Sequence, residues 1–158
     1  MTFRSPSSTW CSGYTEVFPR GDLRFDLRKE RIGDTAESRM YRFVSPWFAL
    51  NQDNYRIYQA SNPSERVELL NRILIGNLLS FAKGMGMTVE SRLTVSTDLH
   101  SARTGFKNEH IVVFYGTFSV NYELPSCAGI GKSISRGFGT LQPLRGSGPS
   151  PLPSQCIV

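Results

Sequence analysis

The hydrophobic and polar positions form their clearest helical pattern in the middle of the chain. Apolar side chains recur there mostly at spacings of three and four residues, which predicts an amphipathic helix. These residues are Val67, Leu70, Ile73, Leu74, Leu78 and Phe81. Asn62 can cap the first turn, with Pro63 at the first helical position and Glu65 completing a capping box. Gly84 and Gly86 end the pattern. The apolar stripe is most simply explained by packing against a sheet.

Strand patterns flank this helix. Residues 41–45 are rich in large apolar side chains and stop at Pro46, as a strand does at a turn. Residues 87–95 alternate between apolar and polar side chains, which predicts a half-buried strand. Residues 110–124 are largely apolar on both faces, which predicts a central strand. A last short strand is expected over residues 137–141.

The remaining segments are less regular. Residues 22–42 mix charged side chains with partly alternating apolar ones and are interpreted as hairpin strands. Residues 51–59 favour a short helix with Asn51 as its N-cap, and residues 97–109 are interpreted as a linker. The order is then strand, helix, strand, strand, loop, strand. This order predicts an α+β fold, a ferredoxin-like split β-α-β domain in which a C-terminal glycine-rich loop replaces the second helix.

Length and composition indicate one compact domain with loose ends. Of 158 residues, 39% are hydrophobic and 20% charged, which excludes collagen, coiled coil and wholesale disorder. We predict an N-terminal extension over residues 1–39, partly disordered or a hairpin remnant. A folded domain over 40–144 and a disordered tail over 145–158 follow. No apolar run reaches the roughly 18 residues of a membrane span, and no secretory signal is recognised. A cytoplasmic location without membrane contact is therefore expected.

Charge and cysteine usage narrow the chemistry. The net charge of +5 at pH 7 favours a polyanionic partner, although many basic proteins bind no nucleic acid. Cys11, Cys127 and Cys156 lie far apart, without a CxxC pair or a histidine cluster. Reduced thiols are expected, and neither a metal site nor a cofactor is predicted.

The most informative stretch reads C-A-G-I-G-K-S-I-S-R-G-F-G and covers residues 127–139. Its glycines permit positive φ and let backbone N–H groups approach an anion closely. Lys132 and Arg136 add two cations, while Ser133 and Ser135 can donate hydrogen bonds to phosphate oxygens. The stretch is therefore a candidate phosphate-binding loop, and the plain alternative is a long hairpin loop made of turn residues.

A second alternative is a P-loop that binds a nucleotide. Gly131-Lys132-Ser133 matches the end of the P-loop pattern. Ser126, however, stands where the first glycine belongs, and Gly137 and Gly139 would interrupt the helix that must follow. The sequence therefore disfavours a P-loop ATPase or GTPase.

The glycines themselves carry a family resemblance. Gly129-Ile130-Gly131 and Gly137-Phe138-Gly139, five residues apart, resemble the glycine-rich loop of the RAMP superfamily. Further segments resemble one branch of it, the CRISPR-associated endoribonucleases that process repeat RNA, the Cas six (Cas6) family. These segments are residues 41–43, 45–51, 54–55, 69–83 and 118–125. The resemblance spans roughly residues 40–142 and corresponds to the C-terminal portion of family members.

The resemblance implies a RAMP/RRM-type ferredoxin-like domain that binds CRISPR repeat RNA. It also implies a metal-independent endoribonuclease, in which the ribose 2′-hydroxyl attacks the adjacent phosphate with help from a general base. The loop positions that match the family, and that we expect to bind RNA, are Gly129, Gly131, Lys132, Ser133, Ser135, Arg136, Gly137 and Gly139. Other CRISPR effector subunits and a second copy of the chain are left open as protein partners.

The resemblance transfers no catalytic residue. Family members usually contain two ferredoxin-like domains with the catalytic histidine in the first, which we expect this chain mostly to lack. His100 lies in the expected linker and His110 at a strand entrance, and neither belongs to a family motif. Each is interpreted as a surface or packing residue. The alternative function is therefore a catalytically inert RNA-binding or complex-assembly module.

Two further groups of side chains admit two interpretations each. Four aromatic residues could stack RNA bases, although closing a core is favoured; they are Trp47, Phe48, Tyr55 and Tyr58. Basic residues near the N-terminus could line an RNA groove, although their interleaved acids favour a solvated face. These are Arg20, Arg24, Arg28, Lys29 and Arg31.

Overall fold

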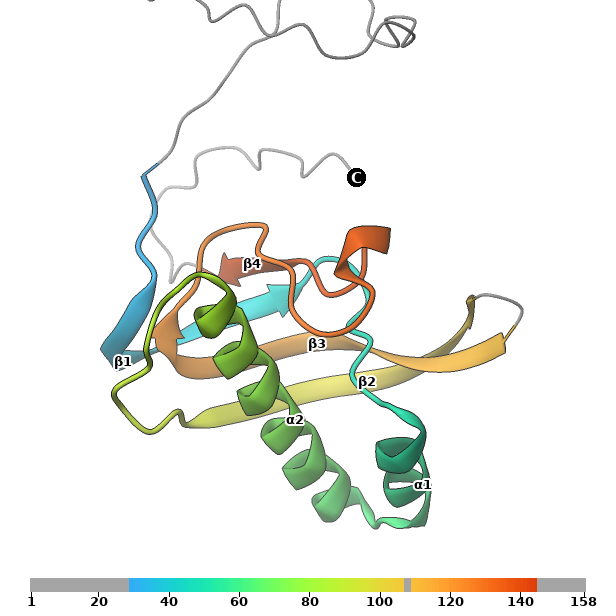
Figure 1. Ribbon diagram of the computed structural model, residues 1–158. Coiled ribbons are helices and arrows are strands. Elements are labelled where there is room, and N and C mark those ends of the chain that lie inside the picture. Colours follow the sequence, from blue (N-terminus) through green and yellow to red (C-terminus); the bar gives the residue numbers. More distant parts are fainter. Residues whose placement is uncertain (1–28, 107–108, 145–158) are drawn as a thin grey trace, which may run out of the picture.

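The structure is a computed structural model that describes residues 29–106 and 109–144 (Figure 1). Its elements are β1 (Gly33–Phe43), α1 (Gln52–Ala60), α2 (Pro63–Gly84), β2 (Val95–Phe106), β3 (Glu109–Glu123), the 3-10 helix η1 (Ile134–Arg136) and β4 (Leu141–Leu144). The predicted order of strand, helix, strand, strand, loop and strand is confirmed. The tail predicted over residues 145–158 lies outside the described residues.

The strands form one antiparallel sheet in the order β2-β3-β1-β4. The connection from β1 to β2 runs through α1 and α2, and the connection from β3 to β4 runs through the glycine-rich loop. Figure 1 shows α2 and this loop on the same face of the sheet. This topology is the predicted ferredoxin-like α+β fold, with a loop in place of the second helix.

Both helices begin where the sequence predicts them. The Asn51 side chain accepts a hydrogen bond from the Asn54 N–H at 2.7 Å and caps α1. At the start of α2, Asn62 accepts from the Glu65 N–H at 3.0 Å, while the Glu65 carboxylate accepts from the Asn62 N–H at 2.9 Å. This reciprocal pair is the predicted capping box, with Pro63 in the first turn. Local sequence alone therefore defines these two starts.

The strand boundaries next to α2 differ from the predictions. Residues 97–109 are not a linker, because β2 spans Val95–Phe106 and pairs with β3 along its whole length. Residues 87–95 alternate like a strand, yet residues 87–94 form the connection from α2 to β2. Both edges of β3 are occupied, by β1 and by β2, so residues 87–94 have no strand edge to join there.

Two other strand predictions also need correction. Residues 33–42, expected in a hairpin, belong to one long strand that pairs with β3 on one side and β4 on the other. Residues 22–28 of that predicted hairpin lie outside the described residues. β1 therefore begins before residue 40, where the sequence places the start of the folded domain. The last strand covers Leu141–Leu144 rather than residues 137–141.

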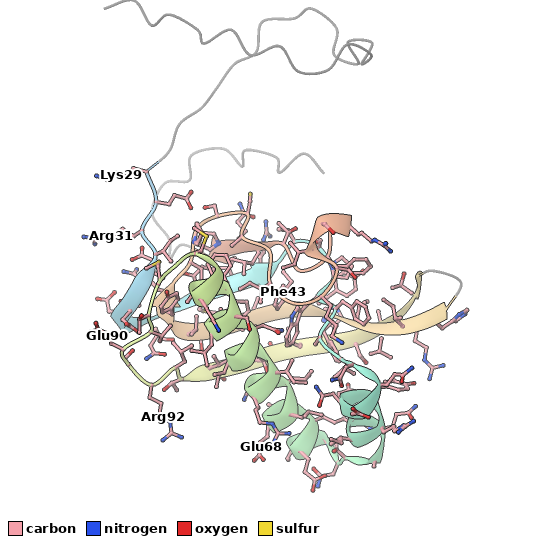
Figure 2. The ribbon with its side chains drawn as sticks, viewed as in Figure 1. Lys29, Arg31, Phe43, Glu68, Glu90 and Arg92 are labelled. Carbon is pink, nitrogen blue, oxygen red and sulfur yellow. The ribbon has the colours of Figure 1, made fainter. Side chains whose placement is uncertain are left out.

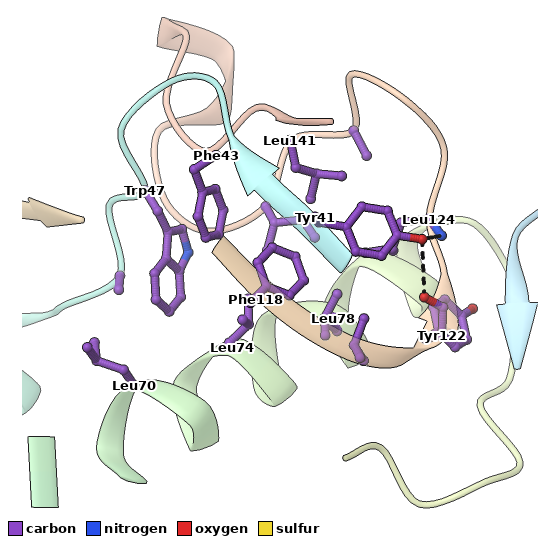
Figure 3. Packing of buried hydrophobic residues seen from close by; sticks show 14 of the residues in the cluster. Tyr41, Phe43, Trp47, Leu70, Leu74, Leu78, Phe118, Tyr122, Leu124 and Leu141 are labelled. Atoms are coloured by element: carbon purple, nitrogen blue, oxygen red, sulfur yellow. Dashed lines mark hydrogen bonds between the residues drawn. The ribbon is translucent and has the colours of Figure 1, made fainter. Parts of the chain in front are cut away.

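The core lies between the sheet and the face covered by α2 and the loop (Figure 3). Aromatic rings from β1, β3 and the segment after β1 stack at its centre, with Phe43 and Trp47 parallel at 5.3 Å between ring centroids. The largest fully buried side chains are Trp47, Tyr41, Tyr122, Phe114, Phe118, Leu74, Leu78, Ile130, Leu141, Val113 and Val120. Because Ile130 and Leu141 belong to this core, the ends of the glycine-rich loop are packed into the fold.

Tyr41 joins β1 to the end of β3. Its hydroxyl accepts a hydrogen bond from the Leu124 N–H at 2.9 Å and donates to the Tyr122 carbonyl at 3.5 Å (Figure 3). Burial raises the pKa of the Tyr41 phenol above its usual value, so the hydroxyl stays protonated near neutral pH. The strand end that leads into the glycine-rich loop is thereby fixed.

Candidate nucleic-acid interface

The glycine-rich loop divides into two parts. The loop stem comprises residues 128–131 and 139–141, and the loop tip comprises residues 132–138. In the stem, the Ile130 N–H donates to the Gly139 carbonyl and the Leu141 N–H to the Ala128 carbonyl, both at 2.9 Å. The stem also bonds to the segment after β1, because the Gly139 N–H donates to the Pro46 carbonyl at 2.8 Å. The stem is therefore tied to the sheet on one side.

Three glycines are required by the shape of the stem. Gly139 has a φ of +71°, and a Cβ there would clash with the Ile130 carbonyl oxygen. Gly131 has a φ of +105°, and a Cβ would lie 2.7 Å from the Trp47 indole nitrogen. A Cβ on Gly129 would clash with the Ile134 side chain. Any larger residue at these three sites would displace the stem.

The loop tip presents polar side chains to solvent. Lys132, Ser135 and Arg136 are exposed, and Ser133 is half-buried. Within the described part of the chain, the backbone N–H groups of Ser133 and Ser135 in the tip, and of Gly131 at the end of the stem, make no hydrogen bond. The structure therefore brings the predicted RNA-binding residues of the tip together with free N–H donors around η1.

Two phenylalanines support the tip from beneath. The rings of Phe48 and Phe138 contact each other with centroids 6.0 Å apart. The Lys132 ammonium lies 5.8 Å from the Phe48 ring centroid, within the range of a cation–π contact. The backbone N–H of Lys132 also donates a hydrogen bond to the Phe48 carbonyl at 3.0 Å. The role of Phe138 was missed by the sequence reasoning, and its signal is an aromatic residue between two glycines.

The tip geometry excludes a P-loop. A P-loop needs a long α-helix directly after its lysine, so that the helix N-terminus faces the phosphates. Here Ser133 adopts a left-handed conformation, with a φ of 56°, and the three-residue helix η1 follows. Gly137 then ends η1 with a φ of 83°. What remains is a cationic loop with free N–H donors, and such a surface can bind the phosphates of a polyanion.

The two histidines lie apart from the loop tip and from each other. The β2–β3 register pairs His100 with Tyr115 and His110 with Gly105, so the two side chains point to opposite faces of the hairpin. His100 lies on the sheet face that α2 leaves uncovered, where its ring stacks on Tyr115 at 5.7 Å. His110 is exposed at the start of β3. The structure therefore assigns neither histidine to the loop.

The acidic and sulfur-bearing residues show no metal site. Among the described residues, no three His, Cys, Asp or Glu side chains cluster closely enough to hold an ion. Cys127 is disulfide-bonded, so the expectation of reduced thiols is wrong at this position. Cys11 and Cys156 lie outside the described residues.

The aromatic and N-terminal basic residues considered as RNA contacts differ in burial and in their distance from the loop. Trp47 is fully buried, which confirms that it closes a core, whereas Phe48, Tyr55 and Tyr58 remain half-buried. Figure 2 shows Lys29 and Arg31 at the start of the described chain, at the opposite end of the molecule from the start of β3. Arg20, Arg24 and Arg28 lie outside the described residues. Lys29 and Arg31 therefore do not extend the loop surface.

No helix among residues 29–106 and 109–144 is long and apolar enough to cross a membrane.

Comparison with known proteins relates this fold to a family of CRISPR proteins. The family model of the Cas6b C-terminal domain matches residues 33–144. An uncharacterized protein of Methanocaldococcus jannaschii is 36% identical over 116 residues, covering 73% of this chain and 79% of the relative.

Two solved structures are similar as well. A crystal structure of Cas6b is 42% identical with a TM-score of 0.71, and the match covers 73% of this chain and 68% of that one. A crystal structure described as the CRISPR RNA processing endoribonuclease Cas6b gives the same identity and TM-score, and 59% of that chain is covered. The similar region therefore leaves a third or more of the second structure unmatched.

Proposed function

Since the chain belongs to the Cas6b family, whose C-terminal domain it contains, we propose that it takes part in CRISPR RNA processing by binding repeat RNA through the loop tip. The family membership supports repeat RNA as the partner. The loop geometry supports the place of contact, because the tip combines two exposed cations with free N–H donors.

The observation that carries this proposal is the rigid support under the tip. The stem is fixed by hydrogen bonds to its own strand partners and to the segment after β1. The tip is thus held open without a ligand, and little conformational entropy is lost when a phosphate binds. Lys132 and Arg136 would bind phosphate oxygens, with the hydroxyls of Ser133 and Ser135 as further donors. Gly129, Gly131, Gly137 and Gly139 would act through the shape of the loop.

The cleavage step is proposed from the family alone. The ribose 2′-hydroxyl would lose its proton to a general base and attack the adjacent phosphate. The bond to the leaving 5′-oxygen would break as that oxygen takes a proton from a general acid, and a cyclic phosphate would remain on the upstream strand. The loop tip could stabilise the added negative charge on the phosphate without a metal ion. No residue is assigned as the base, because His100 and His110 both lie on the β2–β3 hairpin away from the tip.

RNA binding without cleavage is the second candidate function. The stacking of His100 on Tyr115, on the sheet face opposite α2 and the loop, favours it. Such a module could also serve in complex assembly, with other effector subunits or a second copy of the chain as partners.

One experiment separates the two candidates. The purified chain is incubated with labelled repeat RNA in EDTA, and cleavage is followed on a denaturing gel while binding is followed on a native gel. Lys132→Ala/Arg136→Ala is tested beside the matched pair Arg72→Ala/Arg92→Ala. Arg72 and Arg92 are also exposed, so both double variants lose two positive charges.

The outcomes are distinct. Cleavage in EDTA by the unmodified chain shows a metal-independent nuclease, and His100→Ala and His110→Ala then test the base. Binding without cleavage supports the RNA-binding module. Binding that both double variants weaken equally would remove the loop tip as the contact site, and no binding by the unmodified chain would contradict the proposed function.

A further inference from the structure

A cationic hollow lies apart from the loop tip, between α1, the start of α2 and the strands β2 and β3. It has a volume of about 470 Å³, within the range of roughly 300–1,000 Å³ typical of ligand sites. Its lining residues are Tyr55, Tyr58, Gln59, Arg66, Ser101, Ala102, Arg103 and Val112. We call it the α1 cleft. Its lining residues come from α1, the start of α2 and the two strands β2 and β3, whose arrangement Figure 1 shows.

Two arginines give the α1 cleft an uncompensated positive charge. Among the described residues, no carboxylate lies within 4.0 Å of the Arg66 or Arg103 guanidinium, and no acidic residue lines the cleft. Arg66 is held in place, since its Nε donates to the Tyr58 carbonyl at 2.9 Å. A fixed guanidinium with donors left over and no counter-charge is suited to a phosphate.

Aromatic rings lie directly beside these charges. The Arg66 guanidinium carbon lies 4.9 Å from the Tyr58 ring centroid, and the Tyr58 ring also makes an edge contact with Phe114 at 5.5 Å between ring centroids. Tyr55 is half-buried, and its hydroxyl accepts a hydrogen bond from Gln59 at 2.7 Å, which fixes the ring. Fixed tyrosine rings and a planar guanidinium are the surfaces on which unpaired RNA bases stack.

Another hollow among the described residues provides a contrast. It has about 510 Å³, and its lining places Glu30 and Glu123 among Lys29, Arg31 and Arg39. Its two acids offset two of its three cations, and Tyr41 is its one aromatic lining residue. Size alone therefore does not distinguish the two hollows, but charge and aromatic content favour the α1 cleft as the site for a nucleotide.

We infer that the α1 cleft binds one nucleotide of a single-stranded RNA segment, with its base on Tyr55 and Arg66 and its phosphate on Arg103. This inference deepens the proposed function and rests on it, because the bound strand would be the same RNA that contacts the loop tip. The two sites are connected through Phe48, which lies under Lys132 and just ahead of α1.

The test uses the full chain and a single-stranded RNA that carries 4-thiouridine. Affinity is measured for Arg103→Glu and, as a control with the same charge change, for Arg92→Glu. Arg92 is exposed on the connection from α2 to β2, at the far end of the molecule (Figure 2). We expect Arg103→Glu to weaken binding at least tenfold more than Arg92→Glu, and Arg103→Gln to follow in the same direction. Photo-crosslinks should map to the peptide that contains Tyr55 and Tyr58.

The results separate this inference from the proposed function. Equal effects of Arg103→Glu and Arg92→Glu, while Lys132→Ala/Arg136→Ala still weakens binding, would overturn the cleft and leave the loop tip in place. A loss through Arg103→Glu without a loss through the tip variant would keep the cleft and overturn the tip. Binding of free uridine monophosphate as tight as that of the RNA would overturn the assignment to a strand.

Discussion

The loop stem and the loop tip are parts of one glycine-rich loop, residues 128–141, yet they meet opposite physical demands. In the stem, Ile130 is buried in the core and Gly139 leaves no room for a Cβ. In the tip, Lys132 and Arg136 are exposed to solvent. The comparison teaches that residues of a single motif can divide between building a shape and presenting charge, so substitutions in the two parts should fail in different ways.

The division also changes what the glycines mean. Glycines in a phosphate-binding loop are commonly explained by close approach of the backbone to the ligand. Here Gly129, Gly131 and Gly139 are enclosed by Ile134, Trp47 and Ile130, which belong to the protein itself. Of the four loop glycines, Gly137 lies in the tip, where its positive φ ends η1. Three glycines therefore serve folding first and binding only through the shape of the tip.

The largest expected effect is on stability, from Gly139→Ala in the stem. The added Cβ would meet the Ile130 carbonyl oxygen, and a φ of +71° is unfavourable for alanine. We expect the free energy of unfolding to fall by about 3 kcal/mol, from strain and overpacking together. Urea denaturation followed by circular dichroism measures the change.

Gly76→Ala is the matched control for this prediction. Gly76 lies within α2, and a Cβ there would meet nothing within 4 Å. Because alanine favours the helix more than glycine does, we expect the free energy of unfolding of this variant to rise by about 1 kcal/mol. A Gly139→Ala chain as stable as the unmodified one would show that the stem is not the rigid part of the loop.

The next effect is on affinity, from Lys132→Ala/Arg136→Ala in the tip. Both side chains are exposed, so we expect the free energy of unfolding to change by less than about 0.5 kcal/mol. The loss of two charged phosphate contacts should weaken RNA binding by about tenfold or more. Fluorescence anisotropy with labelled repeat RNA measures the affinity, and thermal unfolding measures the stability. If the tip variant lost stability as Gly139→Ala is expected to, the proposed difference between stem and tip would be contradicted.

The smallest expected effect comes from Ser133→Gly, also in the tip. Ser133 has a φ of 56°, which costs a residue with a Cβ more than it costs glycine. Glycine also raises the chain entropy of the unfolded state, which offsets part of this effect. We therefore expect the free energy of unfolding to rise by about 0.5 kcal/mol. Ser133→Ala serves as the control, because it removes the hydroxyl and keeps the backbone strain. If Ser133→Gly and Ser133→Ala were equally stable, backbone strain at this position would not lower the free energy of unfolding.

Much of the fold could be predicted because its signals are local. The capping box of Asn62 and Glu65 defines the start of α2 within four consecutive residues. The sequence predicts a linker where β2 lies, because β2 is an edge strand rich in polar residues such as Asp98, Ser101 and Arg103. Strand formation there depends on pairing with β3, and a pairing partner is a property of the tertiary structure.

The candidate site could be predicted only in part for the same reason. The glycines, cations and serines of the loop are adjacent in sequence, so their pattern identified the loop. The division into stem and tip depends on Trp47 and Phe48, which lie about 80 residues earlier and contact the loop only in the folded chain. Arg66 and Arg103 of the α1 cleft come from α2 and β2, and no sequence pattern relates them.

The salt dependence of RNA binding tests the central claim most directly. The slope of log affinity against log salt counts the phosphates that a protein neutralises, at about 0.7 for each contact on a single strand. For Lys132→Ala/Arg136→Ala we predict a slope shallower than that of the unmodified chain by about 1.4, while Arg72→Ala/Arg92→Ala keeps the original slope. An unchanged slope in the tip variant, with its fold intact, would contradict the assignment of RNA phosphates to the loop tip.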